Sequence, residues 1–347
     1  MTRQLNIARV MHLLGRLAQP RCVASYFGVA LAKYFHLLTV PVTPPRIDIE
    51  PINTCNLRCS HCQVPYWTKP VARLDADRFR LILDQLPGLL SIKLQGMGEP
   101  FLNRHLPELL RQSTVRHISV QVISNGTVLT DELVNQLLKL NRTHICFSVD
   151  GAIATTFESI RIGADYARVV GGIRELVRRR GSASSPQVSL ATVVTQRNLA
   201  ELSQMVELAH SLRVDSLFFQ LVLTDWGKDT LANHNQGLRV DFEGPTTRDA
   251  VAKAMATAER LGVKLTVQQD DRYSRSNRCP WPWTRAFIAA NGDVVPCCIL
   301  ADSDTIKMGN VFEQNFAEIW NSAAYREFRR RIRDHQLYDF CRGCYGE

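Results

Sequence analysis

Residues 53–62 read N-T-C-N-L-R-C-S-H-C, and this stretch decides how the rest of the chain is interpreted. Cys55, Cys59 and Cys62 leave gaps of three and two residues, so one tight loop can aim all three sulfurs at a single point. Three cysteines are one short of the usual ligand set of a cuboidal iron-sulfur cluster, which leaves one iron open to another molecule. Zinc, with His61 as a fourth ligand, is the competing interpretation, although structural zinc sites usually have paired two-residue gaps.

Length and charge narrow the class of protein. The chain has 347 residues, of which 45% are hydrophobic and 22% charged, so it can bury a large core. Much of the net charge of +9 lies in short clusters such as 178–180 and 329–331, which we expect on solvated helix faces. No reader motif or interleaving of aromatic and basic residues accompanies this charge, so a nucleic-acid partner is not expected.

The N-terminal region decides the expected location. No secretory signal and no uninterrupted apolar run of membrane-spanning length is evident, which predicts a cytoplasmic protein. Residues 23–41 come closest to a membrane segment, but Lys33 and His36 interrupt them. We expect residues 1–45 to form a helical arm packed on the core. A helix lying in a membrane interface is the alternative, so peripheral membrane contact through this arm stays open.

The ten cysteines are unevenly distributed. Without export signals they favour metal ligation or reactive thiols over a disulfide framework. Cys22 and Cys146 are isolated, whereas five cysteines fall near the C-terminus: Cys279, Cys297, Cys298, Cys341 and Cys344. The sequence therefore indicates two metal sites.

From residue 46 onward, short β-branched runs alternate with helical patterns, which indicates a parallel sheet wrapped by helices. The predicted strands are 46–52, 91–95, 117–123, 143–149, 187–194 and 216–223. The predicted helices are 75–86, 106–113, 131–139, 166–180, 199–211 and 247–261. Six units are fewer than the eight of a closed barrel, so we predict an α/β fold with a partial (β/α)6 barrel at residues 46–270.

A polar break near 270–277 predicts a small C-terminal module at residues 271–347. Within it, Asn291-Gly292 predicts a tight β-hairpin turn in which both central residues have positive φ. Cys297 would follow that hairpin. Functional residues of the barrel should lie just after its strands, and the cysteine loop, Gly96–Pro100 and Ser124–Gly126 do so.

At these residues the chain resembles the radical S-adenosylmethionine (SAM) enzymes, whose hallmark is C-x3-C-x-aromatic-C, with His61 in the aromatic position. The resemblance implies that Cys55, Cys59 and Cys62 hold a 4Fe-4S cluster whose fourth iron is chelated by the amino and carboxylate groups of SAM. Reduction would then cleave SAM to methionine and a 5′-deoxyadenosyl radical. A flavodoxin- or ferredoxin-type protein would be the electron donor.

Further residues match SAM-binding positions of that superfamily. The cofactor-binding residues that the resemblance implies are His61, Gly96, Gly98, Glu99, Ser124, Asn125, Ser148 and Arg161. Gly96 and Gly98 let backbone groups approach the SAM ammonium, for which Glu99 would supply a charged acceptor. Ser124 and Asn125 would bind the ribose. Ser148 and Arg161 would bind the SAM carboxylate; an exposed arginine at a helix end is the alternative for Arg161.

The C-terminal module resembles the SPASM and twitch extensions of the same superfamily. The resemblance implies one auxiliary 4Fe-4S cluster with four protein ligands, Cys279, Cys297, Cys341 and Cys344. Cys298 is left as a spare or alternative ligand, and a zinc ribbon is the competing interpretation. A fully ligated cluster has no open iron, so this centre would pass electrons rather than hold substrate.

The reaction is less constrained than the class. The first hypothesis is dehydrogenation of a small alcohol or sugar-like substrate, with electron loss through the auxiliary cluster. The alternatives are modification of a peptide or protein, and redox-neutral epimerisation or adenosylation of a carbohydrate or lipid. Candidate catalytic residues are Cys146, as a hydrogen-atom donor, and Asp150, as a substrate contact. A buried structural cysteine is the alternative for Cys146.

Overall fold

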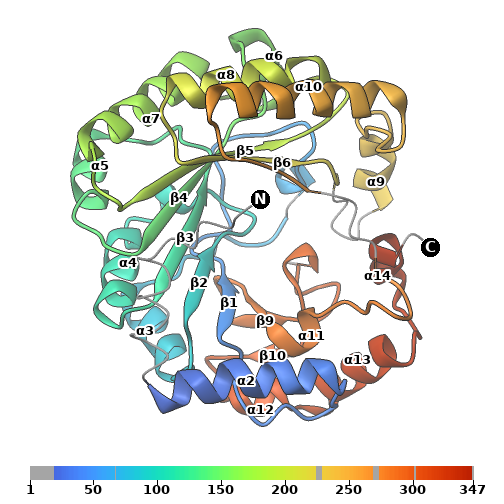
Figure 1. The fold of residues 1–347 in the computed structure, drawn as a ribbon. Coiled ribbons are helices and arrows are strands. Elements are labelled where there is room, and N and C mark those ends of the chain that lie inside the picture. The colour runs from blue at the N-terminus through green and yellow to red at the C-terminus, as the bar shows by residue number, and fades with distance from the viewer. Residues whose placement is uncertain (1–18, 67, 224–228, 269–272, 301, 346–347) are drawn as a thin grey trace.

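The computed structural model describes residues 19–345 except 67, 224–228, 269–272 and 301. A single ten-stranded sheet runs through these residues in the order β10-β9-β8-β1-β2-β3-β4-β5-β6-β7, and it curves around an interior with helices outside (Figure 1). The barrel strands pair in parallel with one another: β1 (Arg46–Ile49), β2 (Ser91–Leu94), β3 (Ser119–Ser124), β4 (Thr143–Ser148), β5 (Gln187–Val193), β6 (Ser216–Gln220) and β7 (Leu265–Val267). The predicted α/β partial barrel is therefore confirmed.

Helices cover the outer face of this sheet. They are α3 (Ala76–Asp84), α4 (Leu106–Val115), α5 (Asp131–Leu137), α6 (Ala154–Ile160), α7 (Tyr166–Arg180), α8 (Leu202–Ser211) and α10 (Pro245–Leu261). The helix α9 (Asp229–Gln236) instead contacts the cysteine loop, where His234 Nε2 lies 2.7 Å from the Ser60 carbonyl oxygen. The sequence predicted all of these except α6 and α9. Side chains cap the N-termini of α3, α5 and α7. Asp75, Thr130 and Asp165 each accept a hydrogen bond from a backbone N–H in the first turn.

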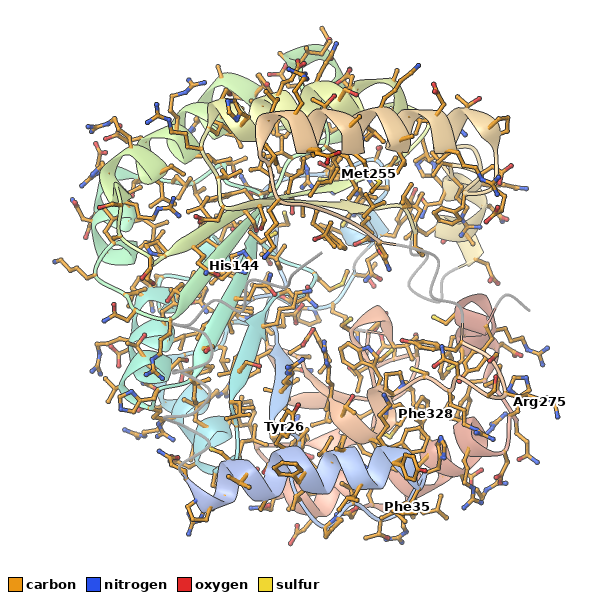
Figure 2. All side chains as sticks on the ribbon, viewed as in Figure 1. Tyr26, Phe35, His144, Met255, Arg275 and Phe328 are labelled. Carbon is orange, nitrogen blue, oxygen red and sulfur yellow. The ribbon has the colours of Figure 1, made fainter. Side chains whose placement is uncertain are left out.

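The two faces of the barrel strands differ in polarity. In β3, Val120 and Val122 are buried on the face that the helices cover. Gln121, between them, lies on the opposite face. Lys93, Gln121 and His144 are in register on β2, β3 and β4, and Figure 2 shows His144 on the concave side of the sheet. A closed barrel fills this space with branched apolar side chains. The polar lining here is typical of a surface that meets water or a polar ligand.

The C-terminal part extends the same sheet rather than forming a separate one. It contains α11 (Trp281–Thr284), β8 (Phe287–Ile288), β9 (Asp293–Val295), β10 (Gly309–Asn310), α12 (Phe316–Trp320), α13 (Ala323–Arg333) and α14 (Asp339–Arg342). β8 pairs in parallel with β1, and β9 pairs with β8 as the expected antiparallel hairpin. The predicted boundary at residue 270 lies outside the described residues.

The detailed prediction for the hairpin turn is wrong. Only Gly292 has a positive φ, of 90°, and Asn291 does not. The Gly292 N–H donates to the carbonyl of Ala289 at 2.8 Å, so the turn begins two residues before the Asn-Gly pair. This longer turn needs one left-handed residue, which glycine supplies without strain.

The described part of the N-terminal arm contains the helix α2 (Pro20–Tyr34), which lies along one side of the molecule and packs against α11 (Figure 1). Residues 1–18 of the predicted arm lie outside the described residues. Within the described part of the chain, no helix has the length and apolar content needed to cross a membrane.

A buried arginine holds the arm to the C-terminal part. Arg329 on α13 is fully buried, and it donates to the carbonyl oxygens of Pro282 at 2.8 Å and Leu38 at 2.9 Å. Its guanidinium carbon lies 4.4 Å from the centre of the Trp320 ring and 4.8 Å from that of Tyr325. Burial lowers the pKa of Arg329 to about 10, so the group is charged at neutral pH. Carbonyl dipoles and aromatic faces thus replace a carboxylate partner.

We expect Arg329→Lys to lower the stability of the protein by about 3 kcal/mol, because a lysine cannot reach both carbonyls and stack on the rings together. The exposed Arg326→Lys is the matched control on the same helix. The measurement is the apparent melting temperature of both variants under anaerobic conditions. Equal melting temperatures for Arg329→Lys and wild type would contradict the anchoring role.

Candidate active site

The cysteine loop begins where β1 ends, and two neighbouring segments fix its shape. Backbone N–H groups of Arg58 and Ser60 donate to the carbonyls of Ile162 at 3.0 Å and Ile160 at 2.8 Å. On the other side, a Cβ at Gly98 would lie 2.2 Å from the carbonyl oxygen of Ile52. The Gly96–Pro100 loop can therefore pack against the start of the cysteine loop only with glycine at position 98.

The three thiols of this loop are close enough to influence one another. Burial raises the pKa of Cys55 and Cys62 above the ordinary value, and that of Cys59 to about 12. The neighbouring thiolates of Cys55 and Cys62 raise the pKa of Cys59 further. Three thiolates this close together, of which Cys59 is buried and the other two are partly buried, need compensating positive charge, which a cluster of iron ions supplies. The donor set and its burial fit the cluster that the sequence predicts.

Single-ion sites are a different arrangement. Among residues 19–345 outside the gaps named above, no group of three or more His, Cys, Asp or Glu side chains is close enough to hold one metal ion. A cuboidal cluster binds each cysteine to a different iron and so needs its sulfurs farther apart than one ion does.

Glu99 ties the loops after β2 and β3 together. Its carboxylate accepts hydrogen bonds from the Phe101 N–H at 3.0 Å, the Ser124 hydroxyl at 2.8 Å and the Asn125 N–H at 2.6 Å. The side chain is only 2% exposed, and this burial raises its pKa above the ordinary value. The predicted ammonium acceptor is thus engaged in bonds within the protein, and its expected contact with SAM stays a prediction.

The predicted ribose residues lie beside the cysteine loop. The Asn125 amide nitrogen is 3.7 Å from the Cys55 sulfur and 3.0 Å from the Asn56 side-chain oxygen, and its own oxygen accepts from the Thr127 N–H at 2.9 Å. The Ser124 oxygen also accepts from the Gly126 N–H at 3.0 Å. The structure brings this pair to the cysteine site that the motif predicts for it.

Arg161 is buried and paired, so the alternative of an exposed arginine at a helix end is wrong. It follows the last residue of α6, is 7% exposed, and its guanidinium lies 2.7 Å from Asp150 Oδ2 and 3.9 Å from the Cys59 sulfur. Asp150 is fully buried and accepts from the Val193 N–H at 2.8 Å through its other oxygen. His61 Nε2 lies 3.9 Å from Asp150 Oδ2, and burial lowers the pKa of His61.

This pairing was missed by sequence reasoning, which placed Asp150 with the substrate and Arg161 with SAM. Within the pair, Asp150 orients a guanidinium that faces the cysteine site. The positive charge close to Cys59 stabilises its thiolate form.

Cys146 lies on the inner face of β4. Ile145, Phe147 and Val149 are fully buried in the core, so Cys146 shares the opposite face with Ser148. Cys146 is 5% exposed, and burial raises its pKa while a hydrogen bond with Ser189 lowers it. The position fits either a hydrogen-atom donor or a structural cysteine, and the catalytic role stays a prediction.

The C-terminal cysteines converge from three segments. Burial raises the pKa of Cys279 to about 12, and the nearby Cys344 raises it further. Burial also raises the pKa of Cys297, to which the charges of Cys279 and Cys341 add. A hydrogen bond joins two of these segments, because the Cys279 backbone N–H donates to the side-chain hydroxyl of Tyr345 at 3.0 Å. The four thiols fit the predicted auxiliary cluster.

Cys298 has different surroundings from Cys297. Burial raises the pKa of both thiols. The charged groups that next affect the pKa of Cys298 are Asp48, Lys93 and Arg285, whereas those for Cys297 are Cys298, Cys279 and Cys341. Asp48 and Lys93 lie on β1 and β2. Cys298 therefore lies next to the barrel strands, although its charge also acts on Cys279. Cys297 as the fourth auxiliary ligand stays a prediction.

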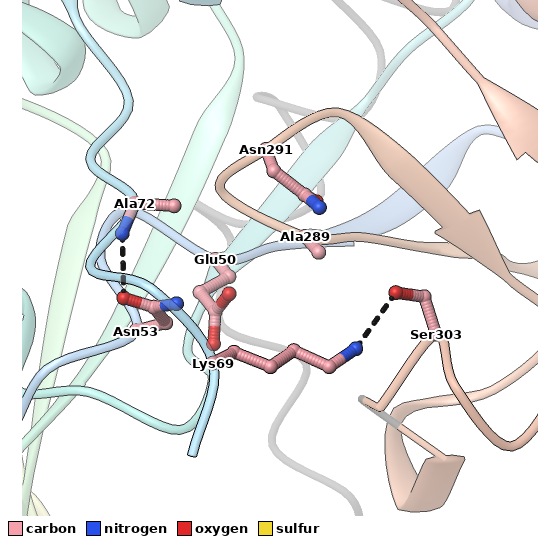
Figure 3. Close-up of a pocket in the computed structure, with 7 residues that line it drawn as sticks. All are labelled: Glu50, Asn53, Lys69, Ala72, Ala289, Asn291 and Ser303. Atoms are coloured by element: carbon pink, nitrogen blue, oxygen red, sulfur yellow. Dashed lines mark hydrogen bonds between the residues drawn. The ribbon is translucent and has the colours of Figure 1, made fainter. Parts of the chain in front are cut away.

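A buried glutamate between the barrel and the hairpin was also missed. Glu50 accepts from the Met97 N–H at 2.7 Å and the Ala290 N–H at 3.1 Å, and burial raises its pKa to about 7. It lines a cavity of about 20 Å³ with Lys69 and Ser303, which hydrogen-bond to each other at 3.0 Å (Figure 3). That volume suits a single water rather than a substrate. A polar residue in a predicted strand was the only signal for Glu50.

Because the pKa of Glu50 is raised from 4.5 to about 7, the folded protein keeps a proton that the unfolded chain loses. Stability should therefore fall by up to about 3 kcal/mol as pH rises from 4.5 to 7, and level off above. Glu50→Gln cannot ionise, so its melting temperature should improve relative to wild type across this range. The exposed Glu132→Gln is the control, and its melting temperature should follow that of wild type. A difference in melting temperature between Glu50→Gln and wild type that stays constant with pH would contradict the assignment.

The chain is similar to known proteins in both sequence and structure. Residues 49–209 match the model of the radical SAM superfamily, and residues 279–345 match that of the SPASM iron-sulfur cluster-binding domain. The chain is 26% identical to a tungsten-containing aldehyde ferredoxin oxidoreductase cofactor-modifying protein of Pyrococcus furiosus, over 85% of this chain and 86% of that protein.

Two further relatives and one solved structure are similar over comparable lengths. The AdoMet-dependent heme synthase of Methanosarcina barkeri is 28% identical over 86% of this chain and 87% of its own. The PqqA peptide cyclase of Xanthomonas campestris is 26% identical over 88% and 80%.

Streptococcus suis SuiB bound to S-adenosylmethionine has the same fold, with a TM-score of 0.70 and 17% identity over 88% of this chain and 71% of that one. Both family models match in the order that the sequence motifs predicted. The cofactors are accordingly SAM and iron-sulfur clusters of the SAM-binding and auxiliary kinds. The chain belongs to the radical SAM superfamily and carries a C-terminal SPASM-type iron-sulfur domain.

Proposed function

We propose that this enzyme uses radical SAM chemistry to modify a peptide. The observation that carries the proposal is the similarity to a PqqA peptide cyclase, which extends over 88% of the chain and includes both matched domains. SuiB, which shares the fold, has also been solved bound to its precursor peptide SuiA. These relatives favour peptide modification, our alternative hypothesis from the sequence, over dehydrogenation of a small alcohol.

A small organic substrate is the second candidate. Two relatives support it by their names, a heme synthase and a protein that modifies the cofactor of a tungsten enzyme. The polar inner face of the sheet, with Lys93, Gln121 and His144 in register, suits a polar small molecule as well as a peptide side chain.

The site residues have the following roles in this proposal. Cys55, Cys59 and Cys62 hold the SAM-binding cluster, which supplies the electron that cleaves SAM. Arg161 keeps a positive charge at Cys59 and is held there by Asp150. Glu99 fixes the Ser124–Asn125 turn next to Cys55.

The C-terminal residues complete the proposal. Residues 46–270 form the barrel and 271–347 the auxiliary-cluster domain, with Cys279, Cys297, Cys341 and Cys344 as the ligands of the second cluster. Held by these ligands, that cluster would accept the surplus electron of a net oxidation. A flavodoxin- or ferredoxin-type protein supplies electrons to the first cluster.

Cys297→Ser should lose the auxiliary cluster, whereas Cys298→Ser should keep it, because the two thiols face different groups. The expected iron content after anaerobic reconstitution is about eight per chain for wild type and Cys298→Ser, and about four for Cys297→Ser. Iron and acid-labile sulfide are measured together with the electron paramagnetic resonance of the reduced protein. The reverse pattern would assign the ligand to Cys298.

The function is tested with cluster-loaded protein, SAM and dithionite in deuterated buffer, with and without a panel of synthetic peptides. We expect 5′-deoxyadenosine to form and one peptide to lose two hydrogen atoms per modification, detected by mass spectrometry. Modification of a porphyrin or another small molecule instead would favour the second candidate. Absence of 5′-deoxyadenosine from fully loaded protein would contradict radical SAM activity itself.

The role of Cys146 is decided in the same assay. If the enzyme epimerises its substrate, wild type incorporates deuterium without loss of hydrogen, and Cys146→Ala abolishes product while still forming 5′-deoxyadenosine. If the reaction is an oxidation, Cys146→Ala retains product formation. Cys22→Ala, which removes another buried thiol on α2, is the control.

A further inference from the structure

Exposed apolar side chains are concentrated on one short segment. Thirteen large hydrophobic residues are exposed in the described part of the chain, and six of them lie within twelve consecutive positions. These six form the α2 apolar face: Tyr26 (43% exposed), Phe27 (58%), Leu31 (56%), Tyr34 (77%), Phe35 (62%) and Leu37 (40%). Single exposed hydrophobic residues are common on proteins, whereas a contiguous group marks a surface that binds something.

The α2 apolar face is a fixed part of the surface. The opposite side of α2 is buried through Cys22, Val29 and Ala32, and its Gly28 packs on Val42. After the helix, the carbonyl of Leu37 accepts from the Trp283 ring N–H at 2.7 Å. Figure 2 shows Tyr26 and Phe35 at one edge of the molecule, with Met255 toward the opposite edge. The exposure is therefore not a consequence of a loose helix.

The segment of sequence that carries this face is basic. Residues 1–47 contain Arg3, Arg9, Arg16, Arg21, Lys33 and Arg46 and no aspartate or glutamate. They contribute six of the nine net positive charges of the chain. On α2 itself, Arg21 and Lys33 are exposed beside the apolar residues. An apolar stripe with basic residues at its borders and aromatic rings on it is typical of helices that lie in the interface of an anionic membrane.

We propose that the α2 apolar face docks the enzyme on the surface of a membrane that contains anionic lipids. Insertion would be shallow, with α2 lying in the plane of the headgroups. The tyrosine rings suit this position, because each has an apolar body and a polar hydroxyl. This inference concerns where the enzyme acts and goes beyond its proposed reaction.

Charge also disfavours the other occupants of the face. A two-fold dimer through α2 would bring the same patch of each copy together, and with it Arg21 and Lys33 of both chains. Residues 1–18 of the same chain carry three arginines and no acidic residue, so they would meet a surface of like charge. An anionic lipid surface is the occupant that complements both the apolar and the basic groups.

The test uses full-length, cluster-loaded protein and sedimentation with lipid vesicles. Vesicles of phosphatidylcholine alone are compared with vesicles of phosphatidylcholine and phosphatidylglycerol. We expect binding to the second kind, weakened by added salt, and little binding to the first. The assay needs no turnover, so its result is independent of whether the substrate is a peptide.

Leu31→Glu is the decisive variant, and Met255→Glu on α10 is its matched control, because both wild-type side chains are 56% exposed. We expect Leu31→Glu to weaken binding to the anionic vesicles by about tenfold or more, and Met255→Glu to leave it within about twofold. Lys33→Glu should weaken binding and reduce its dependence on salt. Iron content and melting temperature verify that each variant is folded.

Several outcomes would overturn the proposal. They are absence of wild-type binding to anionic vesicles at low salt, equal binding by Leu31→Glu and wild type, and equal losses in Leu31→Glu and Met255→Glu. A wild-type dimer that Leu31→Glu dissociates would assign the face to contact between copies instead. Size-exclusion chromatography with light scattering distinguishes that case.

Discussion

The parallel pairing of β1 with strands on both sides is the constraint on which the rest of the structure depends. β1 pairs with β2 on one side and with β8 on the other, where the Asp48 N–H donates to Ala286 at 3.0 Å and the Glu50 N–H to Ile288 at 2.8 Å. The cysteine loop leaves the end of this strand. The same strand therefore fixes the first cysteine group and, through β8, positions the C-terminal cysteines relative to it.

Around the cysteine loop, polar groups are bound to the protein itself before any ligand arrives. Glu99 holds the loops after β2 and β3, and Asp150 holds Arg161 at the Cys59 sulfur. Both carboxylates are almost completely buried, which is tolerable because each accepts bonds from N–H, hydroxyl or guanidinium donors. Such internal bonds orient the surrounding groups in advance, so less ordering is required on binding.

The sequence predicts features that depend on local pattern and misses those that depend on contacts between distant segments. The six barrel strands follow from their β-branched runs, and the cysteine groups from their spacing. β7, with three residues, is too short to give a pattern. The pair Asp150–Arg161 forms because α6 folds back on β4, and the raised pKa of Glu50 depends on burial beside Ala290, 240 residues away. Neither contact can be predicted from the residues next to it in the sequence.

The continuity of the sheet sets a limit on how the protein can be divided. Two-part proteins are often joined by linkers and can be expressed as separate fragments. Here a fragment ending before β8 would leave an open hydrogen-bonding edge on β1, at the strand that carries the cysteine loop. A C-terminal fragment would in turn lack the strand against which its hairpin is aligned. The part that holds the auxiliary cysteines is in this sense a structural component of the barrel, and it cannot be exchanged between relatives as an independent cassette.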